Sequence, residues 1–165
     1  MLANSIKTCL LVLLLLIVSA CASNPEPRNR ELSASQKSTA NDVLFHAISL
    51  VGTPYKYGGN SPNTGFDCSG FVKAMYEQTI GLALPRRAVE QAAATQPIDK
   101  SELQPGDLVF FNTLKSAFSH VGIYVGDNKF IHSPRSGSEV RVEDMHQSYW
   151  LRRFDGARRV MPLVA

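Results

Sequence analysis

One cysteine and two histidines are the residues of this chain whose types could carry covalent chemistry. Cys68 follows the turn Gly65-Phe66-Asp67, and apolar residues after it recur at helical spacing as far as Gly81. Asp67 is a good N-cap, so the thiol is predicted to lie in the first turn of a helix. Free backbone N–H groups and the helix dipole favour a thiolate there. By itself the pattern fits a small buried cysteine in a core helix equally well.

The histidines fall in the second half of the chain, on two predicted strands. His120 opens the alternating run 120–125, and His132 closes the run 129–132, which follows a tight turn. A thiolate that attacks a carbonyl needs one histidine to move the proton and a further polar group to orient that imidazole. Metal binding is the rival use of cysteine and histidine, but these three residues lack the spacing of a zinc site. We therefore expect nucleophilic catalysis without a metal or cofactor.

Strand register decides whether the two imidazoles can share one site. Side chains alternate between the faces of a sheet, so a two-residue turn at Asp127 and Asn128 would turn His132 away from His120. A three-residue loop over 126–128 would instead set His132 opposite Gly122, whose missing side chain leaves room for both rings. We predict the three-residue loop, Asn128 at positive φ, and the imidazoles within hydrogen-bonding distance.

Helices precede strands along the chain. Helical spacing of apolar residues predicts a helix over 41–52, the Cys68 helix and a third helix from Pro85 to about Thr95. Strand patterns follow at 108–111, 120–125, 129–133, 140–142 and 157–161, whereas 149–154 is ambiguous. This order predicts an α+β fold with an antiparallel sheet. His46 and His146 are expected on the surface.

Size and charge bound the class of protein. A chain of 165 residues with 44% hydrophobic and 19% charged residues fits one globular domain with appendages. The net charge of +3 is too small to indicate a nucleic-acid partner.

The N-terminus reads as an export signal rather than as part of the fold. Residues 9–18 are an unbroken apolar run, and a bilayer crossing needs about twenty. The run ends in Val18-Ser19-Ala20-Cys21, which resembles a bacterial lipobox, although an ordinary signal cleaved nearby is the alternative. The resemblance implies lipidation of Cys21, and Ala22 after it favours the outer membrane. We expect a signal peptide over 1–20, a lipidated cysteine and flexible tether over 21–40, and a folded domain over 41–165.

The number of cysteines supports Cys68 as a candidate reactive thiol. Cys9 would leave with the signal and Cys21 would carry lipid, so Cys68 remains without a disulfide partner. In an oxidising compartment, an unpaired thiol is expected either to be protected by burial or to have a chemical function.

Several motifs together resemble the NlpC family of papain-like cell-wall cysteine peptidases. They are Gly52-Thr53-Pro54-Tyr55-Lys56-Tyr57-Gly58-Gly59, Asp67-Cys68-Ser69-Gly70-Phe71, Pro105-Gly106-Asp107-Leu108-Val109-Phe110-Phe111, His120-Val121-Gly122-Ile123-Tyr124 and Phe130-Ile131-His132. The resemblance covers residues from about 41 to 160. It implies a papain-like α+β fold with Cys68 as nucleophile, His120 as general base and acid, and His132 as the orienting residue. Tyr55 and Ser69 would line the oxyanion or substrate site.

The same resemblance implies a substrate, although not which bond is cut. It points to peptidoglycan stem peptides, hydrolysed next to D-amino acids by a lipid-anchored enzyme on the periplasmic side of the outer membrane. The D,D cross-link and the bond after D-glutamate both remain open, as do oligomeric state and an adaptor partner. Arg86 and Arg87 are most simply part of a solvated face, and contacts of Arg86, Arg87 and Arg135 with the substrate remain open. Acyl transfer to another acceptor and non-catalytic peptidoglycan binding are the alternative functions.

Overall fold

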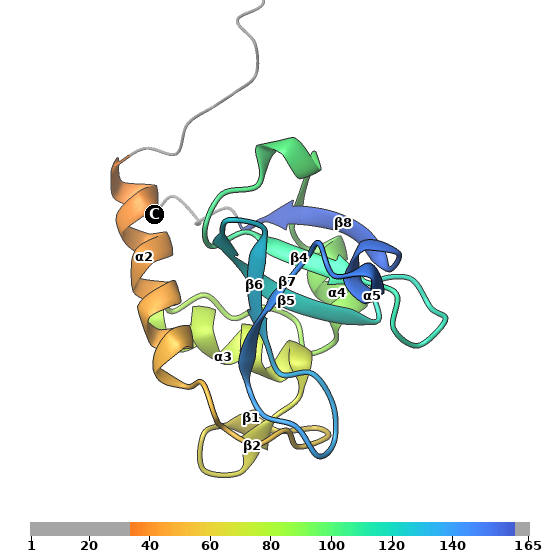
Figure 1. The fold of residues 1–165 in the computed structure, drawn as a ribbon. Helices are drawn as coiled ribbons and strands as arrows, with labels where there is room; N and C mark the ends of the chain where they lie inside the picture. Colours follow the sequence, from red (N-terminus) through yellow and green to blue (C-terminus); the bar gives the residue numbers. More distant parts are fainter. Residues whose placement is uncertain (1–33, 161–165) are drawn as a thin grey trace, which may run out of the picture. The chain divides into compact units, whose positions relative to one another are not determined.

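The computed structural model describes residues 34–160, in which helices lead and an antiparallel sheet follows (Figure 1). This order confirms the predicted α+β class. The helices are α2 (Ala34–Ser49), α3 (Cys68–Ile80), α4 (Ala88–Ala93) and α5 (Ser148–Leu151). The strands are β1 (Asn60–Ser61), β2 (Gly65–Phe66), β3 (Gln96–Ile98), β4 (Leu108–Phe111), β5 (His120–Gly126), β6 (Lys129–His132), β7 (Arg141–Asp144) and β8 (Phe154–Arg159). A short 3₁₀ helix spans Lys100–Glu102.

Helix α2 begins at Ala34, whereas the domain was expected to begin near Asn41. Residues 34–40 therefore lie in a helix and not in a tether. No glycine or proline interrupts this stretch. Ala40 also packs closely on the turn before β4, because a Cβ added at Gly106 would lie 2.9 Å from the Cβ of Ala40. This contact helps to hold the early turns of α2 on the domain.

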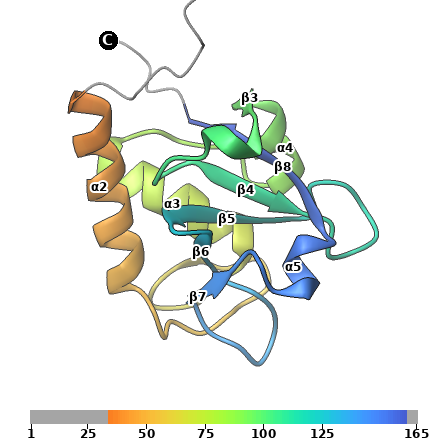
Figure 2. The same ribbon diagram turned by 45° about the horizontal axis from the view of Figure 1, so that its top comes forward.

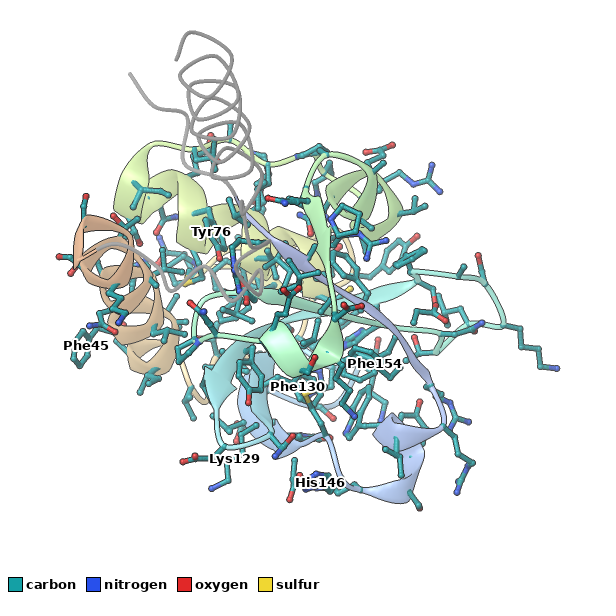
Figure 3. The ribbon with its side chains drawn as sticks, turned by 90° about the horizontal axis from the view of Figure 1, so that it is seen from above. Phe45, Tyr76, Lys129, Phe130, His146 and Phe154 are labelled. Atoms are coloured by element: carbon teal, nitrogen blue, oxygen red, sulfur yellow. The ribbon has the colours of Figure 1, made fainter. Side chains whose placement is uncertain are left out.

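The apolar stripe predicted for this first helix is only partly buried. Val43, Leu44 and Ala47 are in the core, but Ile48 and Val51 are about half exposed. Phe45 is 73% exposed, and Figure 3 shows it pointing away from the domain. The buried face is narrower than the stripe because α2 contacts mainly α3.

Helix α3 forms as its sequence predicts. Asp67 is the N-cap, and its carboxylate accepts from the backbone N–H of Gly70 at 2.7 Å. Gly81 ends the helix in the left-handed conformation, with φ of 71°. Phe71 and Met75 on its inner face are fully buried, and α3 packs against α2 and β5. Cys68 is therefore the first residue of a helix that is fixed along its length.

The sheet has six antiparallel strands in the order β3-β8-β4-β5-β6-β7. Alternation along β4 divides the core: Leu108 and Phe110 face the helices, whereas Val109 and Phe111 face Trp150 of α5. Figures 1 and 2 show α3 lying against the sheet with α2 beside it. Figure 3 shows Phe130 and Phe154, which belong to the second cluster around Trp150. The segment 149–154, ambiguous in sequence, contributes to α5 and to the start of β8.

No helix within residues 34–160 is both long and apolar enough to cross a bilayer. The predicted signal peptide and Cys21, for which lipidation is predicted, lie outside the described residues.

Candidate active site

The hairpin between β5 and β6 sets the two histidines side by side, by a different route from the one predicted. Asp127 and Asn128 form a two-residue turn with φ of 50° and 55°, and Gly126 pairs with Lys129. The predicted positive φ of Asn128 is confirmed, whereas the predicted three-residue loop is wrong. A β-bulge at Val125 supplies the extra residue within the strand itself.

The bulge restores the register that the longer loop would have given. Beyond it Ile123 pairs with Ile131, and continuing the pairing sets His132 opposite Gly122. A Cβ on Gly122 would lie only 2.6 Å from Cδ2 of Phe130 and 3.2 Å from Cβ of His132. Position 122 therefore has to be glycine for Phe130 and the end of β6, including His132, to keep their places.

The two imidazoles are hydrogen bonded, as predicted. Nε2 of His120 lies 2.7 Å from Nδ1 of His132, and the ring planes are nearly perpendicular at 89°. Both side chains are buried, and burial lowers the pKa of each, while the neighbouring His132 lowers the pKa of His120 further. At neutral pH both rings are therefore uncharged.

Glu143 on β7 completes this chain of side chains and was not predicted from sequence. Its Oε1 lies 3.7 Å from Nε2 of His132, a buried nitrogen with no other polar partner among residues 34–160. Trp150 donates its indole N–H to Oε2, and Arg141 donates to Oε1. Burial alone would raise the pKa of Glu143, but the neighbouring His132 and the hydrogen bonds from Trp150 and Arg141 outweigh burial and lower that pKa to about 2. The carboxylate is therefore charged at neutral pH.

The charged carboxylate fixes the tautomers of both histidines. A negative oxygen beside Nε2 of His132 favours a proton on that nitrogen, which leaves Nδ1 of His132 as an acceptor. Nε2 of His120 must then donate to it. The lone pair of His120 consequently remains on Nδ1, where it can accept a proton from a thiol. Through His132, the charge of Glu143 thus leaves Nδ1 of His120 unprotonated, so that His120 can act as a base.

The Cys68 sulfur lies beside the start of β5. The backbone N–H groups of Val121, Ser69 and Cys68 itself act to lower the pKa of the Cys68 thiol. Ser133, next to His132, is buried and donates to the carbonyl of Phe66 at 2.7 Å. This hydrogen bond ties the end of β6 to the turn before the cysteine, so it holds the thiol and the histidines in register.

Arg86 fixes the N-cap of the cysteine helix. Its Nη1 and Nη2 donate to the two carboxylate oxygens of Asp67 at 2.9 and 2.6 Å, and Nη1 also donates to Oγ of Ser69 at 3.0 Å. A bidentate pair of this kind has a defined geometry. Arg86 was expected in a solvated face; it instead holds the turn that presents Cys68. Its neighbour Arg87 is exposed, as expected.

The thiol differs from the sequence-based expectation of a thiolate. Burial and the nearby charge of Asp67 raise the pKa of Cys68 to about 11, although the three backbone N–H groups act in the opposite direction. The resting site therefore pairs a neutral thiol with a neutral imidazole. The proton has to move to His120 during attack on the substrate rather than beforehand.

Tyr55 and Ser69 occupy different surroundings. Tyr55 is half-buried, and burial together with the charges of Cys68 and Asp67 raises its pKa, which puts it near the thiol. The Ser69 hydroxyl is instead held by Arg86 and lies 3.4 Å from Asp67. The backbone N–H of Ser69, and not its hydroxyl, acts to lower the pKa of the Cys68 thiol.

The remaining histidines lie on the surface. His146 is exposed, whereas His46 is partly buried and bonds to Gln78. Within residues 34–160, no three histidine, cysteine, aspartate or glutamate side chains are grouped so that they could hold a metal ion.

A cysteine at the start of a helix that packs on an antiparallel sheet, with two histidines on that sheet, defines the papain-like class of α+β folds. Solved structures agree with this class. An NlpC/P60 family protein from Bacillus cereus superposes with a TM-score of 0.70 at 36% identity, covering 74% of this chain and 40% of the other.

The sequence itself identifies the family. Residues 52–159 match the NlpC/P60 family, and the chain belongs to that family. It is 48% identical over 114 residues to murein DD-endopeptidase MepH of Escherichia coli, which covers 67% of this chain and 42% of MepH. It is 40% identical over 158 residues to the probable endopeptidase NlpC of Escherichia coli, covering 93% of this chain and 99% of NlpC. The chain thus spans less than half of MepH but nearly all of NlpC.

Proposed function

We propose that this protein is a peptidoglycan endopeptidase that hydrolyses peptide bonds next to D-amino acids through an acyl-enzyme on Cys68. The observation that carries the proposal is the series Glu143, His132 and His120 on neighbouring strands, in which Glu143 and His132 orient His120, together with a cysteine at the start of the helix that packs on the strand of His120. Membership of the NlpC/P60 family and similarity to a murein endopeptidase support peptidoglycan as the substrate.

The geometry supports a two-step acyl transfer. The sulfur of Cys68 attacks the amide carbonyl while Nδ1 of His120 takes the thiol proton. His120 then gives this proton to the leaving nitrogen, and the acyl group stays on sulfur as a thioester. Water attacks the thioester with His120 again as base, which frees the acid and the thiol. The backbone N–H of Cys68, and the Tyr55 hydroxyl, would stabilise the oxyanion.

Intact peptidoglycan tests the reaction. Purified sacculi incubated with the protein should release soluble muropeptides with new amine and carboxylate ends, and Cys68→Ala should release none. Transfer to another acceptor would give products joined to an added amine in place of a free carboxylate. Binding to sacculi without any release by either protein would overturn the proposal and indicate a non-catalytic binding module.

Glu143→Ala should lower kcat about 10- to 100-fold, because His132 would lose the charge that fixes its tautomer, as with other groups that orient a ligand or base. KM should change little, since Glu143 acts through His132. The pH profile gives a second readout: without the carboxylate the pKa of His132 falls further, so the acid limb should move. Asp144→Ala, on the same strand, is the matched control and should leave both quantities unchanged. Unaltered kcat in Glu143→Ala would contradict the tautomer argument.

The mature protein is proposed to be anchored by lipid on Cys21, on the periplasmic side of the outer membrane. Several acyl chains hold a protein firmly where a single chain is marginal. Cys21→Ser should block processing, so that the full-length precursor accumulates in the membrane fraction, as mass spectrometry of the purified protein would detect. Cys9→Ser, within the signal, is the control and should be processed normally. A cleaved, soluble Cys21→Ser protein would mean an ordinary secreted enzyme.

A further inference from the structure

A cleft of about 490 Å³ opens beside His120 on the side away from the cysteine helix. Its lining includes His120, Leu114, Arg135, Arg141 and Tyr149. No residue of α3, and none of the loop that carries Tyr55, contributes to it. The cleft is therefore continuous with the proton-transferring imidazole and separate from the elements that hold the thiol.

The charges in the cleft favour an anion. Glu143 lines it too, but its oxygens are already engaged by Arg141 and the indole of Trp150. Arg135 is exposed on the loop between β6 and β7 and takes part in no ion pair among residues 34–160. The guanidinium groups of Arg135 and Arg141 and the carboxylate of Glu143 give the cleft a net charge of one positive unit. Because Arg141 is paired with Glu143, Arg135 carries this charge. A guanidinium with free donors matches a carboxylate in particular.

The chemistry of His120 indicates which half of a substrate occupies this space. His120 gives its proton to the leaving nitrogen, so this nitrogen must lie next to the imidazole when the bond breaks. Groups attached to that nitrogen extend past His120, away from Cys68. The acyl half stays on the sulfur, on the side of Asp67 and Tyr55. The cleft is thus available to the amine half.

We propose that the cleft binds the amine half of the substrate, and that Arg135 contacts a free carboxylate on the carbon that carries the scissile nitrogen. This inference rests on the proposed peptidase function and narrows it. Tyr149 and Leu114 supply exposed apolar surface for the side chain of the same residue. Arg141 is a poorer partner, because Glu143 already holds its guanidinium.

The inference selects one class of amide over another. In the middle of a peptide, the carbon that carries the scissile nitrogen bears a further amide and no charge. At a C-terminal residue, or in a cross-link through the second amino group of a diamino dicarboxylic acid, that carbon bears a free carboxylate. We therefore expect cross-links and C-terminal bonds to be cut in preference to bonds inside a continuing stem.

Two substrates that differ in one group test the contact. Both share the same acyl half, and the leaving D-alanine carries a free carboxylate in one and a carboxamide in the other. The unmodified enzyme should prefer the carboxylate in kcat/KM by about tenfold, the lower end for a hydrogen bond between charged groups. Arg135→Gln should lose about tenfold on the carboxylate and less than about twofold on the carboxamide. Arg152→Gln removes an exposed positive charge that does not line the cleft, so it should change neither rate.

The outcomes separate this inference from the proposed function. An equal loss on both substrates in Arg135→Gln, or no loss on either, would overturn the carboxylate contact while hydrolysis itself stands. Digestion of sacculi with no cleavage of the carboxylate substrate would overturn it too. If the unmodified enzyme cleaves neither the pair nor sacculi, the proposed function fails and the inference fails with it.

Discussion

Cys68→Ala should reduce kcat on peptidoglycan peptides by at least about 10,000-fold, because no other group in the site can form the thioester. Loss of a nucleophile has effects of this order in other enzymes that work through a covalent intermediate. Binding should survive, since the change removes one sulfur and leaves Asp67, Arg86 and Tyr55 in place. Stopped assays on a defined muropeptide dimer give kcat, and calorimetry gives the affinity.

The same variant separates chemistry from folding. Cys68 is only partly buried, so its replacement should change the melting temperature little. A folded Cys68→Ala protein that still turns over at a few per cent of the original rate would exclude the thiol as nucleophile. A loss of binding equal to the loss of rate would instead point to a structural defect.

His120→Ala should lower kcat by about 1,000- to 10,000-fold, because the Cys68 thiol then has no base to take its proton. The burial that raises the pKa of Cys68 to about 11 makes this dependence strong, since almost no thiolate is present at neutral pH. His146→Ala, which removes an exposed histidine outside the site, is the matched control and should be fully active.

The pH profile gives His120 a signature of its own. The base must be neutral, and burial lowers the pKa of His120 well below its ordinary value of 6.5. Activity should therefore persist as the pH falls through 6.5 and decline only as the lowered pKa is approached. The acid limb should change in His120→Ala. An acid limb centred at or above 6.5 in the unmodified enzyme would contradict a buried, uncharged His120.

The sequence predicted those parts of the site that depend only on residues close together in the chain, above all the helix that begins at Cys68. The N-cap Asp67, the helical period after Cys68 and the stop at Gly81 all lie within one helix, so its bounds could be predicted closely. The sequence also predicted that His120 and His132 share one face, but by way of a three-residue loop, whereas the bulge at Val125 sets that register in the structure.

The parts that sequence missed depend on contacts between distant segments. Glu143 reaches His132 only because β7 pairs with β6, and Trp150 reaches Glu143 from a helix that was ambiguous in sequence. Arg86 looked like a surface residue because its partner Asp67 lies nineteen positions earlier. The bulge at Val125 left no signal, since the bulged residue and a regular strand residue can be the same type.

The thiol shows how opposing effects can mislead a sequence-based expectation. A helix N-terminus lowers a thiol pKa, and that effect can be predicted from sequence. Burial and the charge of Asp67 raise it, and their size depends on how closely the fold packs around the sulfur. In this protein, burial and the charge of Asp67 outweigh the helix N-terminus, so the pKa of Cys68 is raised. The thiol proton must therefore be transferred to His120 during the reaction.

Intact-protein mass spectrometry of a rapidly quenched reaction tests the acyl-enzyme most directly. With excess muropeptide substrate, the protein should gain the mass of the acyl half, and peptide mapping should locate this mass on the segment that contains Cys68. The adduct should disappear as substrate is consumed and should be absent from Cys68→Ala. Turnover with an adduct on another residue, or an acyl mass on the Cys68→Ala protein, would contradict a thioester on Cys68.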